Sequence, residues 1–413
     1  MSRCILHRDI FLYQILIMPK IANKGIHMPS SPIRKLVPFA DQAKKEGKKI
    51  YHLNIGQPDI ETPHIMMEAV QQANLKVLEY TDSRGILSLR KKLATYYNSK
   101  GIDVDYEDVL ITIGGSEAIL FAFMACLDDG DEIIVPEPFY ANYIGFAMAA
   151  GIHIIPITSK IDNGFALPPI ASFQEKITPK TKGIFICNPN NPTGYVYSET
   201  ELLQIRDLIK EKDLYLFSDE AYTEFSYEGK VRSTLTMQGV ADRVIMIDTF
   251  SKKYSACGAR IGALVTKNKQ VIEAVIKFAQ ARLSPPTLEQ IAAEAALGLP
   301  NNYFDETREE YKNRRDILMN RLSKMEGVYC PIPSGAFYAM AQLPVKNTDD
   351  FCQWLLTSFR HNNATIMLAP GSGFYTTPGL GLNEVRLAYV LNEKDINLAM
   401  DCLEQALRVY PNN

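Results

Sequence analysis

Residues 249–262 read TFSKKYSACGARIG and directly follow an apolar run, VIMI, that ends in Asp248. Such a run is typical of a buried strand that ends in a loop. A lysine at that position, Lys252, would lie in a dry pocket, where desolvation depresses its pKa and makes it a nucleophile toward an aldehyde. Arg260 and the hydroxyl of Thr249 are suited to gripping a phosphate. Taken alone, the Lys-Lys pair favours an ordinary solvated surface loop, where most lysines lie.

The sequence around this segment predicts a largely parallel α/β sheet. Apolar runs typical of buried strands occupy 109–113, 132–135, 153–157, 183–187, 214–218, 244–248 and 261–265. Segments with helical periodicity separate several of them, at 115–127, 140–150 and 199–211. This alternation favours a parallel sheet covered by helices, with ligands bound at one loop edge.

The pattern changes after about residue 268 and predicts a smaller α+β domain. Its expected helices are 268–281, 286–298, 303–326, 348–361 and 393–409, and its expected strands are 336–342, 364–368 and 384–390. A short helix over 34–49 and a strand at 51–55 are expected to join this domain, which would make it discontinuous. The predicted divisions are an N-terminal arm (1–30), the first part of the small domain (31–60), the large domain (61–300) and the rest of the small domain (301–413).

Composition and charge exclude several classes of protein. The 413 residues carry 44 Lys and Arg against 47 Asp and Glu, which argues against binding to nucleic acids. Seven scattered cysteines without a CxxC pair indicate a reducing, cytoplasmic compartment, and no metal-ligand spacing is present. The apolar run at 10–18 is too short to span a membrane and lacks the cleavage site of a secretory signal. We therefore expect neither a membrane nor a metal partner.

Three further motifs each follow a predicted strand. FSDEAY at 217–222 places Asp219 where it could pair with a protonated ring nitrogen, although a helix cap is an alternative. NPNNPTG at 188–194 forms a rigid turn that could aim Asn191 at a phenolic oxygen, or serve only as a turn. TIGGSEA at 112–118 begins a helix whose free amides suit a phosphate. It matches neither GxGxxG, the dinucleotide-binding motif, nor GxxxxGK(S/T), the motif for nucleoside triphosphates.

Together and in this order, the motifs resemble the fold-type I pyridoxal-phosphate enzymes, and within them the class I and II aminotransferases of the aspartate aminotransferase family. The resemblance covers roughly residues 30–410 and rests on NPNNPTG, SDEAY, SKKYS…GARIG and VRLAY. It implies pyridoxal 5′-phosphate as the cofactor. It also implies that Lys252 forms the Schiff base and moves the substrate proton, that Asp219 pairs with the pyridine nitrogen, and that Tyr222 and Asn191 bind the phenolic oxygen.

The resemblance also implies a set of residues around the cofactor phosphate and ring. Tyr140 would stack on the ring, where the family commonly has tryptophan, and Tyr80 would reach the phosphate in the neighbouring subunit, so a homodimer with shared active sites is expected. The residues implied in the phosphate site of the same subunit are Gly115, Ser116, Glu117, Thr249 and Arg260.

For the substrates, the resemblance implies an amino acid and a 2-oxo acid. Arg386 of VRLAY would clamp the α-carboxylate, helped by Asn191 and the backbone of Gly56. A dicarboxylate also needs a second cation, for which Arg282 is the first candidate and Arg84 the second; Arg282 is equally compatible with a cation at a helix C-terminus. We expect aspartate and 2-oxoglutarate as the substrate pair, in a ping-pong reaction.

Several alternatives stay open at this point. The same motifs are compatible with an aminotransferase for aromatic or other neutral amino acids, or with another enzyme of the same fold: a C–S β-lyase, a decarboxylase-like enzyme or an aminocyclopropane-forming synthase. A non-enzymatic alternative is an amino-acid-sensing transcriptional regulator. The sequence disfavours it, because the roughly 30 residues before the matching region lack a basic footprint for DNA.

Overall fold

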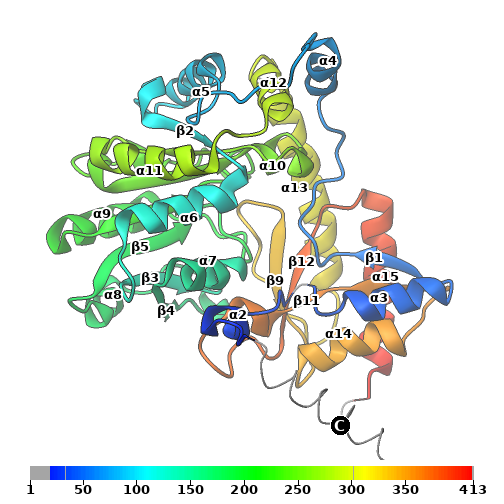
Figure 1. Cartoon of the computed structure of the whole chain (residues 1–413). Coiled ribbons are helices and arrows are strands. Elements are labelled where there is room, and N and C mark those ends of the chain that lie inside the picture. The colour runs from blue at the N-terminus through cyan, green and yellow to red at the C-terminus, as the bar shows by residue number, and fades with distance from the viewer. Residues whose placement is uncertain (1–18, 33, 301, 412–413) are drawn as a thin grey trace, which may run out of the picture. The chain divides into compact units, whose positions relative to one another are not determined.

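A mixed sheet of seven strands carries all the predicted site motifs except VRLAY in the computed structural model, which describes residues 19–32, 34–300 and 302–411 (Figure 1). The strand order within these residues is β2-β8-β7-β6-β5-β3-β4. Strand β8 runs in the opposite direction to the other six strands. The strands are β2 (Val109–Thr112), β3 (Glu132–Glu137), β4 (His153–Thr158), β5 (Thr181–Cys187), β6 (Tyr215–Asp219), β7 (Val244–Thr249) and β8 (Gly262–Val265). The predicted α/β fold class is thereby confirmed.

Helices cover both faces of this sheet. The helices packed on one face are α6 (Gly114–Cys126), α7 (Asn142–Ala150) and α11 (Lys269–Arg282). The opposite face is covered by α5 (Leu87–Ser99), α8 (Ile170–Lys176), α9 (Glu199–Lys212) and α12 (Thr287–Ala296), with α4 (His64–Gln72) against α12. Because strand side chains alternate between faces, Phe185 joins the first core while Ile184 and Ile186 join the second. Every strand in the middle of the sheet is therefore apolar on both sides.

Local sequence explains where these elements begin and how closely they pack. α9 starts at a capping box, in which the Ser198 side chain accepts from the Glu201 amide and the Glu201 carboxylate accepts from the Ser198 amide. In β5, a Cβ added at Gly183 would lie 2.7 Å from the ring of Phe217 on the next strand. A glycine at that point therefore lets the Phe217 ring approach the β5 backbone closely.

Strand β1 (Lys49–His52) and the C-terminal part of the chain build two small sheets. The first pairs β1 in parallel with β10 (Ala364–Met367), and the second has the order β11-β12-β9. The remaining elements here are β9 (Tyr338–Gln342), β11 (Ala369–Pro370), β12 (Glu384–Ala388), α3 (Val37–Lys45), α13 (Asn302–Leu322), α14 (Thr348–Thr357) and α15 (Glu393–Val409). The pairing of β1 with β10 is the kind of contact that a discontinuous small domain requires. The predicted domain limits themselves stay a prediction.

The structure also differs from the sequence-based expectations. Helices α4, α5 and α8 have no counterpart among them, and the helix expected over 34–49 is shorter, since α3 covers only Val37–Lys45. Residues 19–30 contain α2 (Asn23–His27) and belong to a unit separate from the chain that begins at Ser31. The apolar run at 10–18 and most of the predicted arm lie outside the described residues.

None of the helices in the described ranges is both long enough and apolar enough to cross a membrane.

Candidate active site

Lys252 lies on a single helical turn, α10 (Phe250–Lys253), directly after β7. Its Nζ donates to the carbonyl oxygen of Gly56 at 2.9 Å and lies 3.8 Å from Sγ of Cys257. The turn begins at Thr249, whose hydroxyl accepts from the backbone amide of Ser251 at 3.2 Å. The amine of Lys252 therefore faces the loop after β1, across the end of the large sheet.

The ionisation of Lys252 differs from the expectation. Burial lowers the pKa of Lys252, but the nearby Tyr338, Cys257 and Tyr140 together raise it by more, so its pKa lies above the ordinary value. The predicted depressed pKa is therefore wrong for this structure. Desolvation is present, as expected, but groups that can carry negative charge surround the amine and favour its protonated form.

Asp219 ends β6 and is buried. Its carboxylate accepts from the hydroxyl of Tyr143 at 2.7 Å and from the backbone amide of Ala221 at 3.2 Å. Burial is the main cause that raises the pKa of Asp219 above its ordinary value, although these two hydrogen bonds lower it. A buried carboxylate held by two neutral donors suits a positively charged partner, which would offset its desolvation.

Two other predicted residues, Tyr222 and Asn191, are buried close to the C-terminal sheet. The hydroxyls of Tyr222 and Tyr338 are 3.0 Å apart, and Oδ1 of Asn191 accepts from Nη1 of Arg386 at 3.0 Å. The sequence motifs 188–194 and 217–222 thus meet the VRLAY strand at one place.

Arg386, on β12, is fully buried between aromatic rings. Its guanidinium lies 4.6 Å from the ring centre of Tyr338 and 4.8 Å from that of Phe374. Nη2 donates to the carbonyl of Asn54 at 2.6 Å, while Nε of Arg386 and Nδ2 of Asn54 have no partner among the described residues. Burial lowers the pKa of Arg386. A buried guanidinium bound only to neutral oxygens suits a carboxylate ligand.

A candidate phosphate site lies at the start of α6. A Cβ added at Gly114 would lie 2.4 Å from Nη2 of Arg260, so this guanidinium rests directly on the first turn of the helix. A Cβ added at Gly262 of β8 would lie 2.8 Å from the amide nitrogen of Gly115, so the helix start also touches the sheet. Free amides of a first helical turn beside an arginine form a site suited to an anion.

Glu117 and Arg282 form a partly buried ion pair beside this helix start. Oε2 of Glu117 accepts from Nη1 of Arg282 at 2.7 Å and from the backbone amide of Ile113 at 2.8 Å. Nη2 of Arg282 donates to the carbonyl of Ser83 at 2.8 Å. Both terminal nitrogens of Arg282 are thus engaged within the chain. Its predicted contact with a substrate carboxylate stays a prediction that these contacts do not favour.

Three further predicted residues lie outside these contacts. Tyr80 is 78% exposed, and Ser116 is exposed on the first turn of α6. Arg84, the second candidate for a distal carboxylate, pairs with Glu107 at 2.9 Å. No other described residue of the same chain encloses Tyr80, in keeping with the expectation that it serves a neighbouring subunit.

Tyr140 lies just before α7 and is half-buried. Its hydroxyl accepts from Nδ2 of Asn142 at 2.8 Å, and its ring meets the ring of Tyr143 edge to face, with centres 5.4 Å apart. Burial raises the pKa of Tyr140, and the charge of Lys252 opposes this. The ring therefore lies near both Lys252 and the aromatic side chain that holds Asp219.

Sequence reasoning missed Tyr143, Tyr338 and Asn54. Tyr143 had a usable signal, because it lies one helical turn after Tyr140 and its hydroxyl needs a partner when buried. Tyr338 had none: only the fold brings it so close to Gly56 that a Cβ added there would lie 1.8 Å from the tyrosine hydroxyl. Long-range contacts of this kind leave no local pattern.

Comparisons with known proteins agree with this geometry. Residues 48–403 match the family model described as aminotransferase class I and II. The chain is 34% identical to the aspartate aminotransferase of Thermotoga maritima, covering 91% of this chain and 97% of that protein. It is 32% identical to aromatic-amino-acid aminotransferase 2 of Thermococcus litoralis, covering 92% and 96%. The structure of Thermus thermophilus aspartate aminotransferase with maleate is similar at a TM-score of 0.85, with 28% identity, covering 94% of this chain and all of that one.

Proposed function

The chain belongs to the class I and II aminotransferases, and we propose that Lys252 is the lysine that carries its pyridoxal 5′-phosphate. As a member of this family it is a pyridoxal-phosphate-dependent enzyme that transfers an amino group between an amino acid and a 2-oxo acid. The substrate pair, the roles of individual residues and the assembly form the rest of the proposal.

The orientation of two adjacent lysines carries the proposal. Nζ of Lys252 reaches Gly56 O, on the side where Asn191 and Arg386 lie. Nζ of Lys253 is buried on the other side of the turn, 2.5 Å from Oδ2 of Asp248. Of these two lysines, Lys252 is the one that presents its amine to the candidate site.

The residues present fit the cofactor. When bound, pyridoxal phosphate supplies a conjugated ring that accepts the electrons left on the substrate after loss of its α-proton. Asp219 would hold the ring nitrogen, since the donors to its buried carboxylate within the described residues are neutral. Tyr222 and Asn191 would bind the phenolic oxygen. The phosphate would lie at the first turn of α6, bound by backbone amides, Thr249 and Arg260.

The chain's own groups divide the reaction between them. Arg386 binds the α-carboxylate through its guanidinium, whose Nε has no partner within the described chain. The aromatic rings of Tyr338 and Phe374 fix the plane of this guanidinium. The amine of Lys252 would act as the general base that takes the proton from the substrate Cα, and then as the general acid that delivers it to C4′ of the cofactor. A second 2-oxo acid then reverses these steps, which gives ping-pong kinetics.

Aspartate with 2-oxoglutarate is the proposed substrate pair. Its support comes from relatives, because the Thermotoga maritima protein is an aspartate aminotransferase and the Thermus thermophilus structure contains maleate, a dicarboxylate. The second candidate is an aromatic amino acid. It is favoured by the similarity to the Thermococcus litoralis relative.

The proposed assembly is a homodimer with shared active sites. A run of large apolar side chains is exposed on α4 and the loop after it, which is unusual for a monomer surface. These residues are Ile65, Met67, Leu75, Val77, Leu78 and Tyr80. A second copy covering this segment would bring Tyr80 into the partner's phosphate site. A cytoplasmic location is also proposed, and the six described cysteines, all free, are in keeping with it.

Chemical trapping of the cofactor tests the assignment. Borohydride reduction of the holoenzyme, followed by peptide mapping, should place the cofactor on Lys252 and leave Lys253 unmodified. The Lys252→Ala variant should lose the lysine-dependent visible absorption and at least about a hundredfold of the transamination rate, since a positioned general base contributes roughly 10²–10⁴-fold. An adduct mapped to Lys253, or to any other lysine, would refute the assignment.

A further inference from the structure

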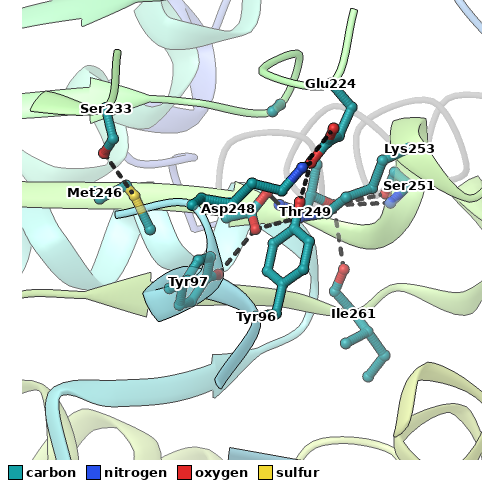
Figure 2. Close-up of polar contacts among 12 residues, drawn as sticks. Tyr96, Tyr97, Glu224, Ser233, Met246, Asp248, Thr249, Ser251, Lys253 and Ile261 are labelled. Carbon is teal, nitrogen blue, oxygen red and sulfur yellow. Dashed lines mark hydrogen bonds and ion pairs between the residues drawn. The ribbon is translucent and has the colours of Figure 1, made fainter. Parts of the chain in front are cut away.

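Behind the Lys252 turn lies a buried polar cluster of Asp248, Lys253 and Tyr97, which the reaction does not use directly (Figure 2). Oδ2 of Asp248 accepts from Nζ of Lys253 at 2.5 Å and from the hydroxyl of Tyr97 at 2.8 Å. The side chains of Lys253 and Asp248 are 2% and 5% exposed. Tyr97 comes from α5, so the cluster joins the end of β7, the lysine turn and a covering helix.

The cluster holds the lysine turn through its backbone neighbours. Asp248 directly precedes Thr249, and its Oδ1 accepts from the Thr249 backbone amide at 2.7 Å. Lys253 directly follows Lys252. The contacts of Asp248 and Lys253 thus fix both ends of the segment 249–252, which contains the reactive lysine and the Thr249 hydroxyl.

A second buried carboxylate, Glu224, connects α5 to the turn that contains Tyr222. Glu224 is buried and accepts from the hydroxyl of Tyr96, next to Tyr97 on α5, and from Nζ of Lys100 at 2.8 Å. Nζ of Lys253 lies 4.7 Å from the centre of the Tyr96 ring. Figure 2 shows that Tyr96 and Tyr97 reach from α5 toward the two carboxylates. Helix α5 is thereby tied to both segments that would hold the cofactor.

We propose that Lys253 and Asp248 act as a positioning pair, which fixes the turn of Lys252 against α5 and so sets the place of the reactive amine. The inference rests on the proposed function of Lys252. Lys253 and Asp248 touch neither substrate nor cofactor in this proposal, and they act only through the 249–252 backbone. An ion pair suits this task because its two charges, buried together, tolerate little displacement.

The test uses the holoenzyme with the double substitution Lys253→Met and Asp248→Asn. This variant removes both charges together, so neither is left buried alone, and the oxygen of the introduced asparagine can still accept from the Thr249 amide. We expect kcat to fall about tenfold to a hundredfold, since a misplacement near 1 Å has costs of that order. KM should change little, the cofactor should dissociate faster, and the pH midpoint of its visible absorption should move.

A control removes a second ion pair, whose lysine side chain is 67% exposed, elsewhere on the sheet. Asp108 is buried before β2 and pairs with Lys269 at 2.8 Å, away from the lysine turn. The variant Asp108→Asn with Lys269→Met should change thermal stability but neither kcat nor the absorption midpoint. If the Lys253/Asp248 double variant matches this control in both readouts, the pair is only structural and the proposal is overturned.

A milder variant keeps the test decisive if the double variant does not fold. Tyr97→Phe removes only the hydroxyl that donates to Asp248, and it should shift the absorption midpoint and lower kcat about threefold. Wild-type values for both would overturn the proposal. Trapping the cofactor in parallel separates the two ideas: an adduct outside Lys252 refutes the proposed function, whereas an adduct on Lys252 with unchanged kinetics refutes only the positioning pair.

Discussion

The surroundings of Arg386 and Arg282 differ, although the sequence predicts a carboxylate partner for both. Arg386 donates to the amide oxygen of Asn191 and the carbonyl of Asn54, both neutral, between two aromatic rings. Arg282 donates to the carboxylate of Glu117. Each has one unpartnered Nε among the described residues. The difference lies in charge, since an acidic side chain neutralises Arg282, whereas the hydrogen-bond acceptors of Arg386 within the described chain are neutral.

This comparison teaches that a buried arginine binds a ligand carboxylate only where its charge remains unmatched within the protein. Burial lowers the pKa of both arginines, because removing each charged guanidinium from water costs free energy. The carboxylate of Glu117 offsets this desolvation cost at Arg282. At Arg386 we expect the carboxylate of the substrate to offset it. The following experiments test the contrast.

Replacing Arg386 should have the largest effect. In Arg386→Gln, kcat/KM should fall about tenfold to a hundredfold for aspartate and phenylalanine alike, because a charge-assisted hydrogen bond contributes roughly 1.5–3 kcal/mol. Cofactor absorption should persist, since Arg386 lies away from the phosphate site. Steady-state kinetics with both amino acids provide the measurement. A loss confined to one of them would show that Arg386 does not hold the common α-carboxylate.

Replacing Arg282 should act mainly on stability. Arg282→Ala leaves the Glu117 carboxylate without its cation and should cost about 2 kcal/mol of unfolding free energy. The loss in kcat/KM should be small and equal for aspartate and phenylalanine, which a denaturant titration and kinetics can measure together. A loss specific to aspartate would instead support the sequence-based expectation that Arg282 binds a distal carboxylate.

Removing both members of the pair should restore most of that stability. In the double variant Arg282→Met with Glu117→Gln, no charge is left buried alone, and the oxygen of the introduced glutamine can still accept from the Ile113 amide. We expect an unfolding free energy within about 1 kcal/mol of the wild type, as is common when a buried ion pair is replaced as a unit. The measurement is a double-mutant cycle, in which the change in unfolding free energy of the double variant is compared with the sum of the changes in the two single variants.

The pH dependence of stability should show the smallest effect. Burial raises the pKa of Glu117, by more than the Ile113 amide and Arg282 lower it. A carboxyl whose pKa is raised by folding binds more protons in the folded state, so stability falls as pH rises from the unfolded value through the folded pKa. In Glu117→Gln this part of the slope, above about pH 4.5, should disappear from chemical unfolding curves. An unchanged slope would show that Glu117 titrates normally.

Local sequence predicted those parts of the site that depend on strand ends. Lys252, Asp219 and Asn191 each follow a buried apolar run, so parallel topology brings them to one edge. The partner of Arg282 was not predictable in the same way, because Glu117 lies 165 residues away in sequence and meets it only through the packing of α11 on α6. Sequence periodicity predicts helices and strands, but it does not predict which side chains of different elements will contact each other.

The two lysines of the turn show the same limit. Nothing in SKKYS distinguishes the surroundings of Lys252 from those of Lys253, since both follow the same strand. The fold distinguishes them by their partners: the amine of Lys253 binds the carboxylate of Asp248, whereas the amine of Lys252 binds the carbonyl of Gly56. The reversed direction of β8 was likewise not predicted, because an apolar run reads the same in either orientation.

The pairing of β1 with β10 has a consequence for biosynthesis. Lys49 lies opposite Ala364, and the loop after β1 supplies the carbonyls of Asn54 and Gly56 to Arg386 and Lys252. A segment made early by the ribosome must therefore wait for a strand made more than 300 residues later before it can dock. A nascent chain stalled before residue 364 would have its reactive lysine but no finished pocket, so activity should arise only after nearly the whole polypeptide has been translated.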